Sequence, residues 1–309
     1  MESYLGVKHV IPCANGTDAL QIAMMGLGLE PGDEVITADF TFAATVEVIA
    51  LLGLTPVLVD VDPYSFNIDP KAIQRAITPK TKAIVPVHLF GQVADMDAIM
   101  AIAEKHNLYV IEDNAQGIGA TFTDANGNTT KTGGIGHVGS TSFFPSKNLG
   151  CYGDGGAIIT NDDDLAHNLR GIVNHGMYER YHHDVVGVNS RLDSLQAVVL
   201  NEKLKLLDYY NERRKRAAIR YSQLLSGHDK IITPNVIRNC DSHVFHQYTL
   251  RLIGSDRDAL VQHLQSQGIP CGVYYPIPLH AQKAYECYNY DEANFSVTNQ
   301  LVKEVISLP

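Results

Sequence analysis

Residues 83–113 read AIVPVHLFGQVADMDAIMAIAEKHNLYVIED, and this stretch decides the fold class. Its two ends, Ala83–Leu89 and Leu108–Asp113, are predicted strands, in which the runs Ala83–Leu89 and Leu108–Ile111 are apolar without alternation. Between them, Asp95–Lys105 carries apolar residues at helical spacing. Strands of this kind are buried on both faces, and a helix between two of them is typical of a parallel sheet covered by helices. The stretch therefore predicts an α/β fold.

The same alternation of strands and helices extends outward through the first two thirds of the chain. Further strands are predicted at His9–Ala14, Glu34–Thr37, Pro56–Val61, Ser140–Phe144 and Ala157–Thr160. Further helices are predicted at Thr17–Gly28, Phe42–Leu52, Pro70–Ala76 and Asp162–Val173. Together these elements predict one large domain over residues 1–205, built on a mainly parallel central sheet.

The last third of the chain has a different organisation. A long helical pattern over Ser194–Leu225 is typical of an interdomain connector. It is followed by a predicted strand at Tyr248–Leu252, a helix at Ser255–Gly268 with Ser255 as its N-cap, and a strand at Cys271–Tyr275. We interpret residues 206–309 as the connector helix and a small C-terminal α/β domain.

Composition narrows the class of protein. The formal net charge of -10 disfavours nucleic-acid binding, which needs a basic face. The five cysteines are scattered and form no C-x-x-C pair, so neither a disulfide framework nor a zinc site is indicated. The N-terminus has no signal-peptide pattern, and the longest apolar stretch, near residues 43–54, is too short to span a bilayer. We predict a cytoplasmic protein without a nucleic-acid or membrane partner.

Two patterns suggest other ligands but lack the context that those ligands require. The sequence GIGHVG at residues 134–139 matches the dinucleotide pattern, yet no strand precedes it, and a strand rather than a helix follows it. The pair His182-His183 has no carboxylate or thiolate partner at metal-ligand spacing. We therefore predict neither a nicotinamide site nor a metal site.

Four positions carry groups that pyridoxal phosphate (PLP) chemistry needs: an amine, an anion for the pyridine nitrogen, a phosphate cradle and a partner for the phenolic oxygen. The Gly16-Thr17 pair opens a helix, where free N–H groups favour an anion. Asp113 ends a buried strand at the edge where parallel sheets bind ligands, and Gln116 follows one short turn later. Lys147 follows a buried strand, where desolvation lowers a lysine pKa.

Each of these signals also has an ordinary explanation. The Gly16-Thr17 segment fits a helix N-cap, Asp113 fits a turn cap, and most lysines are simply exposed. The combination of the four signals is what favours a PLP site.

Taken together, the motifs resemble the DegT/DnrJ/EryC1/StrS family of sugar aminotransferases, which have the aspartate-aminotransferase fold (PLP-dependent transferase type I). The resemblance covers nearly the whole chain. Its motifs are NGTDAL (15–20), Thr41-Phe42, IEDNAQ (111–116), SFFPSKNLG (142–150) with GDGG (153–156), GVNSRLDSLQA (187–197) and YYPIPLH (274–280).

The resemblance implies a role for each candidate residue. Lys147 would hold PLP as a Schiff base, and Asp113 would pair with the pyridine nitrogen. Gln116 would contact the phenolic oxygen, and Phe42 would stack on the face of the ring. The phosphate ligands would be Gly16, Thr17, Ser142 and, from the partner subunit of a homodimer, Asn189.

Within the family, the chain resembles the enzymes that use glutamate to aminate C3 of UDP-linked 3-keto-N-acetylglucosaminuronic acid for bacterial surface polysaccharides such as lipopolysaccharide O antigen. That likeness implies that Arg191, Tyr274 and Tyr275 contact the sugar nucleotide. An arginine suits either a uronate carboxylate or a diphosphate, because its fork binds both in bidentate fashion. The resemblance also implies family segments beyond both ends of this chain, including part of the active-site entrance and of the small domain.

Three alternatives stay open at this stage. The same chemistry could act at C4 of a dTDP-, GDP- or UDP-linked 4-keto sugar. The family also contains sugar dehydratases, but these carry histidine at the position of Lys147. A non-enzymatic alternative is a PLP-binding regulatory protein.

Overall fold

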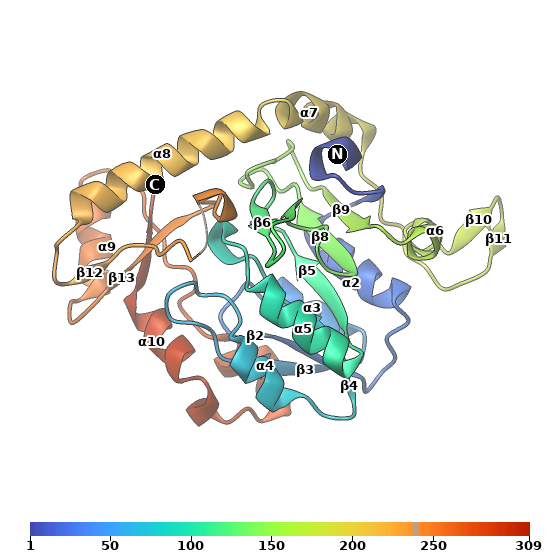
Figure 1. The fold of residues 1–309 in the computed structure, drawn as a ribbon, viewed down its shortest axis with the longest axis horizontal. Helices are drawn as coiled ribbons and strands as arrows, with labels where there is room; N and C mark the ends of the chain where they lie inside the picture. The colour runs from blue at the N-terminus through green and yellow to red at the C-terminus, as the bar shows by residue number, and fades with distance from the viewer. Residues whose placement is uncertain (238–239) are drawn as a thin grey trace.

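The computed structural model describes residues 1–237 and 240–309. A seven-stranded sheet lies at its centre (Figure 1), in the order β1-β9-β8-β5-β4-β2-β3. These strands are β1 (His9–Cys13), β2 (Glu34–Ala38), β3 (Thr55–Val59), β4 (Thr81–Val85), β5 (Tyr109–Asp113), β8 (Val138–Ser142) and β9 (Gly156–Thr160). All neighbours from β3 to β8 pair in parallel, and β9 pairs antiparallel with both β8 and β1. The predicted mainly parallel sheet is confirmed.

Helices cover both faces of this sheet, as Figure 1 shows. They are α2 (Gly16–Gly26), α3 (Ala44–Leu51), α4 (Pro70–Ala76), α5 (Met96–His106) and α6 (Asp163–Ile172). Ile84 and Val110 pack into a core with α4 and α5. Their strand neighbours Ala83, Val85 and Ile111 pack into a second core with α2, α3 and α6. Burial on both faces is the reason that these strands are apolar without alternation.

The connector consists of two helices, and the single helix expected over Ser194–Leu225 is wrong. The first, α7, spans Ser194–Leu204, and the second, α8, spans Leu207–Leu225. Leu206 between them has non-helical dihedral angles. Leu207, the first residue of α8, is completely buried in a third apolar core. No glycine or proline marks the break, so the apolar periodicity runs across it.

A three-stranded antiparallel sheet forms from β12 (Ile231–Ile232), β13 (Tyr248–Leu252) and β14 (Val305–Leu308). The strand expected at Cys271–Tyr275 is wrong, because this segment makes only one bridge, between Gly272 and Ser307, and β14 takes the place beside β13. The helices of this part are α9 (Arg257–Ser266) and α10 (Ser296–Glu304).

The N-cap expected for α9 is also corrected. Asp256 rather than Ser255 caps the helix, because its carboxylate accepts the backbone N–H of Ala259 at 2.9 Å. Gly268 ends the helix region as expected, with a left-handed φ of 72° that favours glycine.

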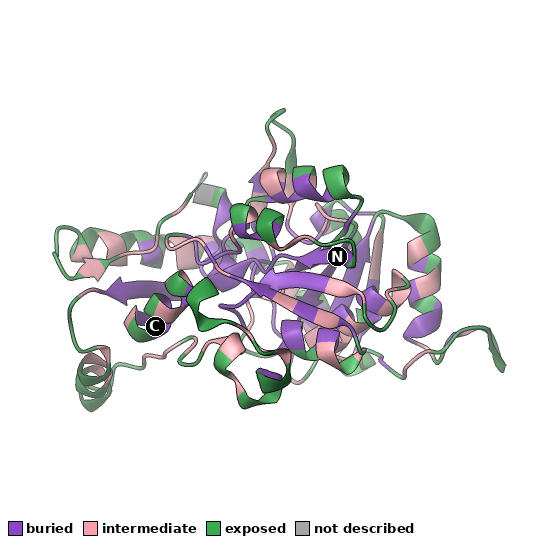
Figure 2. Ribbon diagram, turned by 90° about the horizontal axis from the view of Figure 1, so that it is seen from below, coloured by how far each residue is buried: buried purple, intermediate pink, exposed green. Residues whose placement is uncertain are grey.

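The segment between α9 and α10 returns to the large sheet. Leu279, Tyr285 and Phe295 pack there against Val46 of α3 and Leu58 of β3. Figure 2 shows buried residues gathered on the central sheet, with exposed residues on outer helix faces and projecting loops. The division of the chain at residue 205 stays a prediction.

The remaining elements are short. They are α1 (Glu2–Leu5), the hairpins β6–β7 (Thr121–Thr123 and Thr129–Lys131) and β10–β11 (Met177–Glu179 and His182–His183), and the 3₁₀ helices η1 (Leu89–Gly91), η2 (Cys240–Ser242), η3 (Leu279–Ala281), η4 (Lys283–Tyr288) and η5 (Glu292–Asn294). Among the described residues, no helix is both long and apolar enough to cross a membrane.

Candidate active site

Asp113 lies at the carboxyl end of β5, where it is buried. Its Oδ2 accepts a hydrogen bond from Thr45 Oγ1 at 2.7 Å, and its Oδ1 accepts one from the backbone N–H of Ala115 at 3.1 Å. Ligands of parallel sheets bind at this edge, outside the carboxyl ends of the strands. The structure therefore places a carboxylate, held by a donor on each oxygen, where the sequence predicts the partner of the pyridine nitrogen.

The neighbouring Glu112 explains the glycine-rich segment of residues 133–136. Its Oε1 accepts the backbone N–H groups of Ile135 and Gly136 at 2.7 Å each, and its Oε2 accepts that of Gly133 at 2.7 Å. The backbone N–H groups of this loop thus bind a carboxylate of the protein itself. In a dinucleotide-binding loop, such N–H groups bind a pyrophosphate.

His88 completes the set of donors around Glu112. Its Nδ1 accepts the N–H of Ala94 at 3.2 Å, so the ring hydrogen is on Nε2, which donates to Glu112 Oε2 at 2.9 Å. Both side chains are fully buried. These hydrogen bonds of Glu112 therefore fix the end of β5. Asp113 is the next residue and the last of that strand.

Glu112→Gln is expected to lower the free energy of unfolding by about 3 kcal/mol, because an amide NH₂ would face a backbone donor and leave it unpaired. Urea denaturation measures this loss. Glu104→Gln, at an exposed position of α5, is the matched control and should change stability by less than about 0.5 kcal/mol. Equal stability of the two variants would mean that the Glu112 carboxylate contributes nothing to the fold.

The residues expected to form the phosphate cradle lie where the start of α2 meets the end of β8. A Cβ added to Gly16 would lie 2.7 Å from Cβ of Ser142, so only glycine allows this approach. Asn15 caps the helix by accepting the N–H of Asp18 at 2.8 Å. Gly16 and Thr17 form the first turn of the helix, whose backbone N–H groups favour an anion. The cradle therefore fits a phosphate group.

Aromatic and amide side chains border the other side of the site. Phe42 is 58% exposed, and its ring centroid lies 6.2 Å from that of Tyr275. Gln116 accepts the N–H of Phe90 at 2.7 Å and donates to the Tyr275 hydroxyl at 3.2 Å. Burial raises the pKa of Tyr275, so its phenol keeps its proton. Tyr275, expected to contact the sugar, therefore touches a predicted cofactor residue.

Lys147 lies in the loop that follows β8, where its backbone N–H donates to Phe144 at 2.8 Å. Burial lowers the pKa of its amine, and the negative charge of Asp113 opposes that shift. A desolvated amine near a carboxylate can act as a nucleophile and as a carrier of a proton. Lys147 and Asp113, which follow two different strands, thus lie near enough for their charges to interact.

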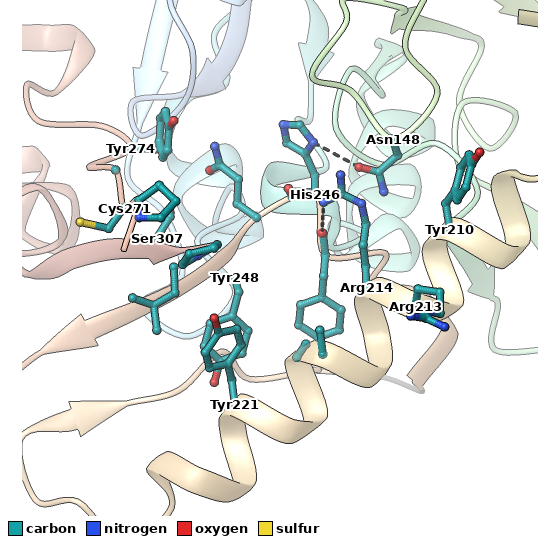
Figure 3. Close-up of a pocket in the computed structure, with 18 of the residues that line it drawn as sticks. Asn148, Tyr210, Arg213, Arg214, Tyr221, His246, Tyr248, Cys271, Tyr274 and Ser307 are labelled. Carbon is teal, nitrogen blue, oxygen red and sulfur yellow. Dashed lines mark hydrogen bonds between the residues drawn. The ribbon is translucent and has the colours of Figure 1, made fainter. Parts of the chain in front are cut away.

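Asn148 fastens the Lys147 loop to the rest of the chain. Its Nδ2 donates to Asn211 Oδ1 of α8 at 2.8 Å, and its Oδ1 accepts a hydrogen bond from His246 Nδ1 at 3.2 Å. Burial, followed by the charges of Lys147 and Arg214, lowers the pKa of His246 to about 3. Asn148 and His246 line a cavity of about 840 Å³. Figure 3 shows it between α8 and the three-stranded sheet. Tyr274, which is 39% exposed, lines the same cavity.

Asn189 and Arg191 are not brought together with the other predicted site residues of the same chain. Both of their side chains are exposed. Ser190 between them is fully buried and donates to Asp18 Oδ2 at 2.6 Å. Its hydroxyl also accepts the N–H of Ala14 at 3.0 Å. The backbone of this segment is thus fixed beside α2, while its two flanking side chains point outward.

Two contacts at the site escape sequence reasoning. One is the hydrogen bond from Thr45 to Asp113. The other joins Asp39, just after β2, to His280, whose Nδ1 lies 2.6 Å from Asp39 Oδ2. Burial raises the pKa of Asp39 to about 6, against the opposing effect of His280. This pair holds the YYPIPLH segment against the large sheet. The YYPIPLH motif is visible in the sequence, but its pairing with Asp39 is not.

The exposed pair His182-His183 lies in the β10–β11 hairpin, where His183 Nδ1 is 2.9 Å from the carbonyl oxygen of His175. Within the described part of the chain, no group of three or more His, Cys, Asp or Glu residues is placed to hold a metal ion.

The model of the DegT/DnrJ/EryC1/StrS aminotransferase family matches residues 1–309. A Geobacillus stearothermophilus protein named a pleiotropic regulatory protein is 50% identical over 99% of this chain and 81% of its own length. The UDP-2-acetamido-2-deoxy-3-oxo-D-glucuronate aminotransferase of Pseudomonas aeruginosa is 48% identical over 100% of this chain and 83% of its own. A UDP-N-acetyl-3-dehydro-alpha-D-glucosamine 3-aminotransferase of Acidithiobacillus ferrooxidans is also 48% identical, over 98% and 79%.

A solved structure shares the fold. The Bacillus subtilis protein NtdA, with bound cofactor PMP, superposes with a TM-score of 0.91 at 36% identity, covering 100% of this chain and 70% of that one. PMP is the pyridoxamine form of PLP. The chain thus spans most of the length of each relative.

Proposed function

Since the chain belongs to the DegT/DnrJ/EryC1/StrS aminotransferase family, we propose that it moves the amino group of glutamate to C3 of UDP-2-acetamido-2-deoxy-3-keto-glucuronic acid. It is a PLP-dependent nucleotide-sugar aminotransferase. The observation that supports the proposed site is the position of Lys147, whose amine has a pKa lowered by burial, within electrostatic reach of the buried carboxylate of Asp113.

The residues around this pair fit the cofactor. When bound, PLP supplies an electron sink for the carbon that gains or loses the amino group. Asp113 would hold a proton at the ring nitrogen, and Lys147 Nζ would take and return the proton that moves during transfer. Gly16, Thr17 and Ser142 would bind the phosphate, and Phe42 would cover one face of the ring.

Two relatives support amination at C3. Both of the 48% identical enzymes are named for a 3-oxo or 3-dehydro UDP-sugar, one a glucuronate and the other a glucosamine. The glucuronate carries a carboxylate that the glucosamine lacks. The exposed guanidinium group of Arg191 would bind this carboxylate. Tyr274 and Tyr275 would contact the sugar nucleotide beside it.

A PLP-binding regulatory protein is the second candidate, because the relative that is 50% identical is named as a regulator. A regulator would bind the cofactor without turning over glutamate and a keto sugar. Amino transfer to a nucleotide sugar therefore separates the two functions.

We also infer a cytoplasmic homodimer that serves bacterial surface polysaccharide synthesis and whose active sites are shared. Helix α7 buries Leu200 yet leaves Leu195 73% and Val198 61% exposed. Tyr152, which is 79% exposed, adjoins them, since its N–H donates to Gln196 of α7 at 2.8 Å. An exposed apolar surface of this kind supports self-association. Asn189 and Arg191 would then complete the partner's site.

Mixing two inactive variants tests the shared site. Lys147→Ala and Arg191→Ala proteins, combined under conditions that exchange subunits, should recover about a quarter of wild-type activity, because about half of the dimers are mixed and each has one intact site. Glutamate-dependent amination measures the recovery. If both residues served the site of their own chain, every site would keep one lesion and no activity would return.

A further inference from the structure

Thr45 is the second residue of α3 and is completely buried. Its hydroxyl does not cap its own helix, because the N-cap of α3 is Ala43 and no side chain caps the helix. Threonine is a preferred N-cap residue and alanine is not, so the alanine at the N-cap of α3 breaks a local preference. Departures of this kind concentrate at functional sites.

The hydroxyl of Thr45 is instead directed at Asp113. The distance from Thr45 Oγ1 to Asp113 Oδ2 is 2.7 Å, and both residues are buried. An ionised carboxylate only accepts hydrogen bonds, so the threonine is the donor. A bond to a charged acceptor inside a protein is stronger than one between neutral groups.

This contact and the N–H of Ala115 place one donor on each oxygen of Asp113. Two donors on different oxygens fix the plane of a carboxylate, whereas a single donor leaves it free to rotate. Each oxygen can accept a second hydrogen bond, so the carboxylate keeps acceptor capacity for a ligand. The branched side chain of Thr45 is itself stiff within a helix.

The same short segment carries Phe42, whose ring is 58% exposed. Phe42 and Thr45 lie three residues apart at the start of α3, on either side of its N-cap Ala43. One rigid segment therefore presents both an aromatic face and the donor that orients Asp113.

We propose that Thr45 is a positioning residue for the cofactor: its hydroxyl fixes the Asp113 carboxylate in the orientation that binds the pyridine nitrogen. This inference rests on the role proposed above for Asp113. Thr45 acts only through that carboxylate, so removing the hydroxyl matters only while the carboxylate is present.

The test is a double-mutant cycle on the affinity for PLP, measured by absorbance titration of the apoproteins. Thr45→Val should weaken PLP binding about tenfold, the scale of one buried hydrogen bond to a charged group. Thr45→Ser, which restores the hydroxyl, should bind within about threefold of wild type. In the Asp113→Asn background, Thr45→Val should change the affinity by less than about twofold.

Thr37→Val is the matched control, because Thr37 is also fully buried but donates to the backbone oxygen of Val85. It should leave PLP affinity within about twofold of wild type. Thermal unfolding of each apoprotein separates loss of fold from loss of cofactor affinity, and Thr45→Ala takes the place of Thr45→Val if valine unfolds the protein.

Two results would overturn the inference: Thr45→Val binding PLP as wild type does, or the same loss in both backgrounds. If Asp113→Asn weakens binding while Thr45→Val does not, only the role of Thr45 is refuted. If Asp113→Asn itself leaves PLP affinity and absorbance unchanged, the proposed site fails at Asp113.

Discussion

Lys147→Ala is expected to lose the visible absorbance of the lysine-bound cofactor and to form no covalent adduct after borohydride reduction. Turnover should fall by at least about a thousandfold, within the range that a positioned acid–base group contributes. The physical reason is that the amine of Lys147 is desolvated beside Asp113, which favours a nucleophile over an ordinary surface ammonium. Absorbance spectra and mass mapping of the reduced protein measure both effects.

Lys82→Ala provides the comparison, since Lys82 is exposed on β4. It should keep the absorbance, the adduct and the activity of wild type. An adduct that maps to Lys80, Lys82 or Lys131 rather than to Lys147 would refute the assignment of the cofactor lysine.

Asp113→Asn is expected to slow the half-reaction with glutamate by at least about a hundredfold, while PLP still binds at saturating concentration. Asparagine keeps the shape of the side chain but removes the charge that would hold a proton at the ring nitrogen. Its NH₂ group would also face one of the two donors, that of Thr45 or that of Ala115. Single-turnover absorbance changes after mixing with glutamate measure the rate.

Near-normal turnover of Asp113→Asn would mean that the carboxylate only caps the turn after β5. The hydrogen bond that it accepts from Ala115, two residues on, is the contact that such a cap would make. The bond from Thr45, by contrast, comes from a residue 68 positions away and has no role in that turn.

The strands of the large sheet and the helices that cover it could be predicted because the local sequence pattern shows which of their residues become buried. Ala83, Ile84 and Val85 are apolar because β4 (Thr81–Val85) faces a core on each side, whereas the predicted strand runs past the end of β4 to Leu89. Pro70–Ala76 is a helix with the bounds predicted, because Asp69 caps it and Pro70 starts it. The strand ends then place the IEDNAQ and SFFPSK motifs at one edge of the sheet.

The misplaced elements depend on contacts between distant residues. Cys271–Tyr275 has a strand-like composition, but β14 is the segment that pairs with β13, and Tyr275 turns instead to Gln116, 159 residues away. The pair of Asp39 and His280 is separated by 241 residues. Neither contact leaves a local periodicity, so no sequence pattern could have indicated it.

The most direct measurement of the proposed function uses ¹⁵N-labelled glutamate with a panel of nucleotide-linked 3-keto and 4-keto sugars. Products are identified by mass spectrometry and NMR. We expect a ¹⁵N amine at C3 of UDP-2-acetamido-2-deoxy-3-keto-glucuronic acid and no amination of any 4-keto sugar. Label at C4 would make the protein a C4 aminotransferase. PLP bound without transfer of label to any sugar would contradict the enzymatic account and favour a regulatory protein.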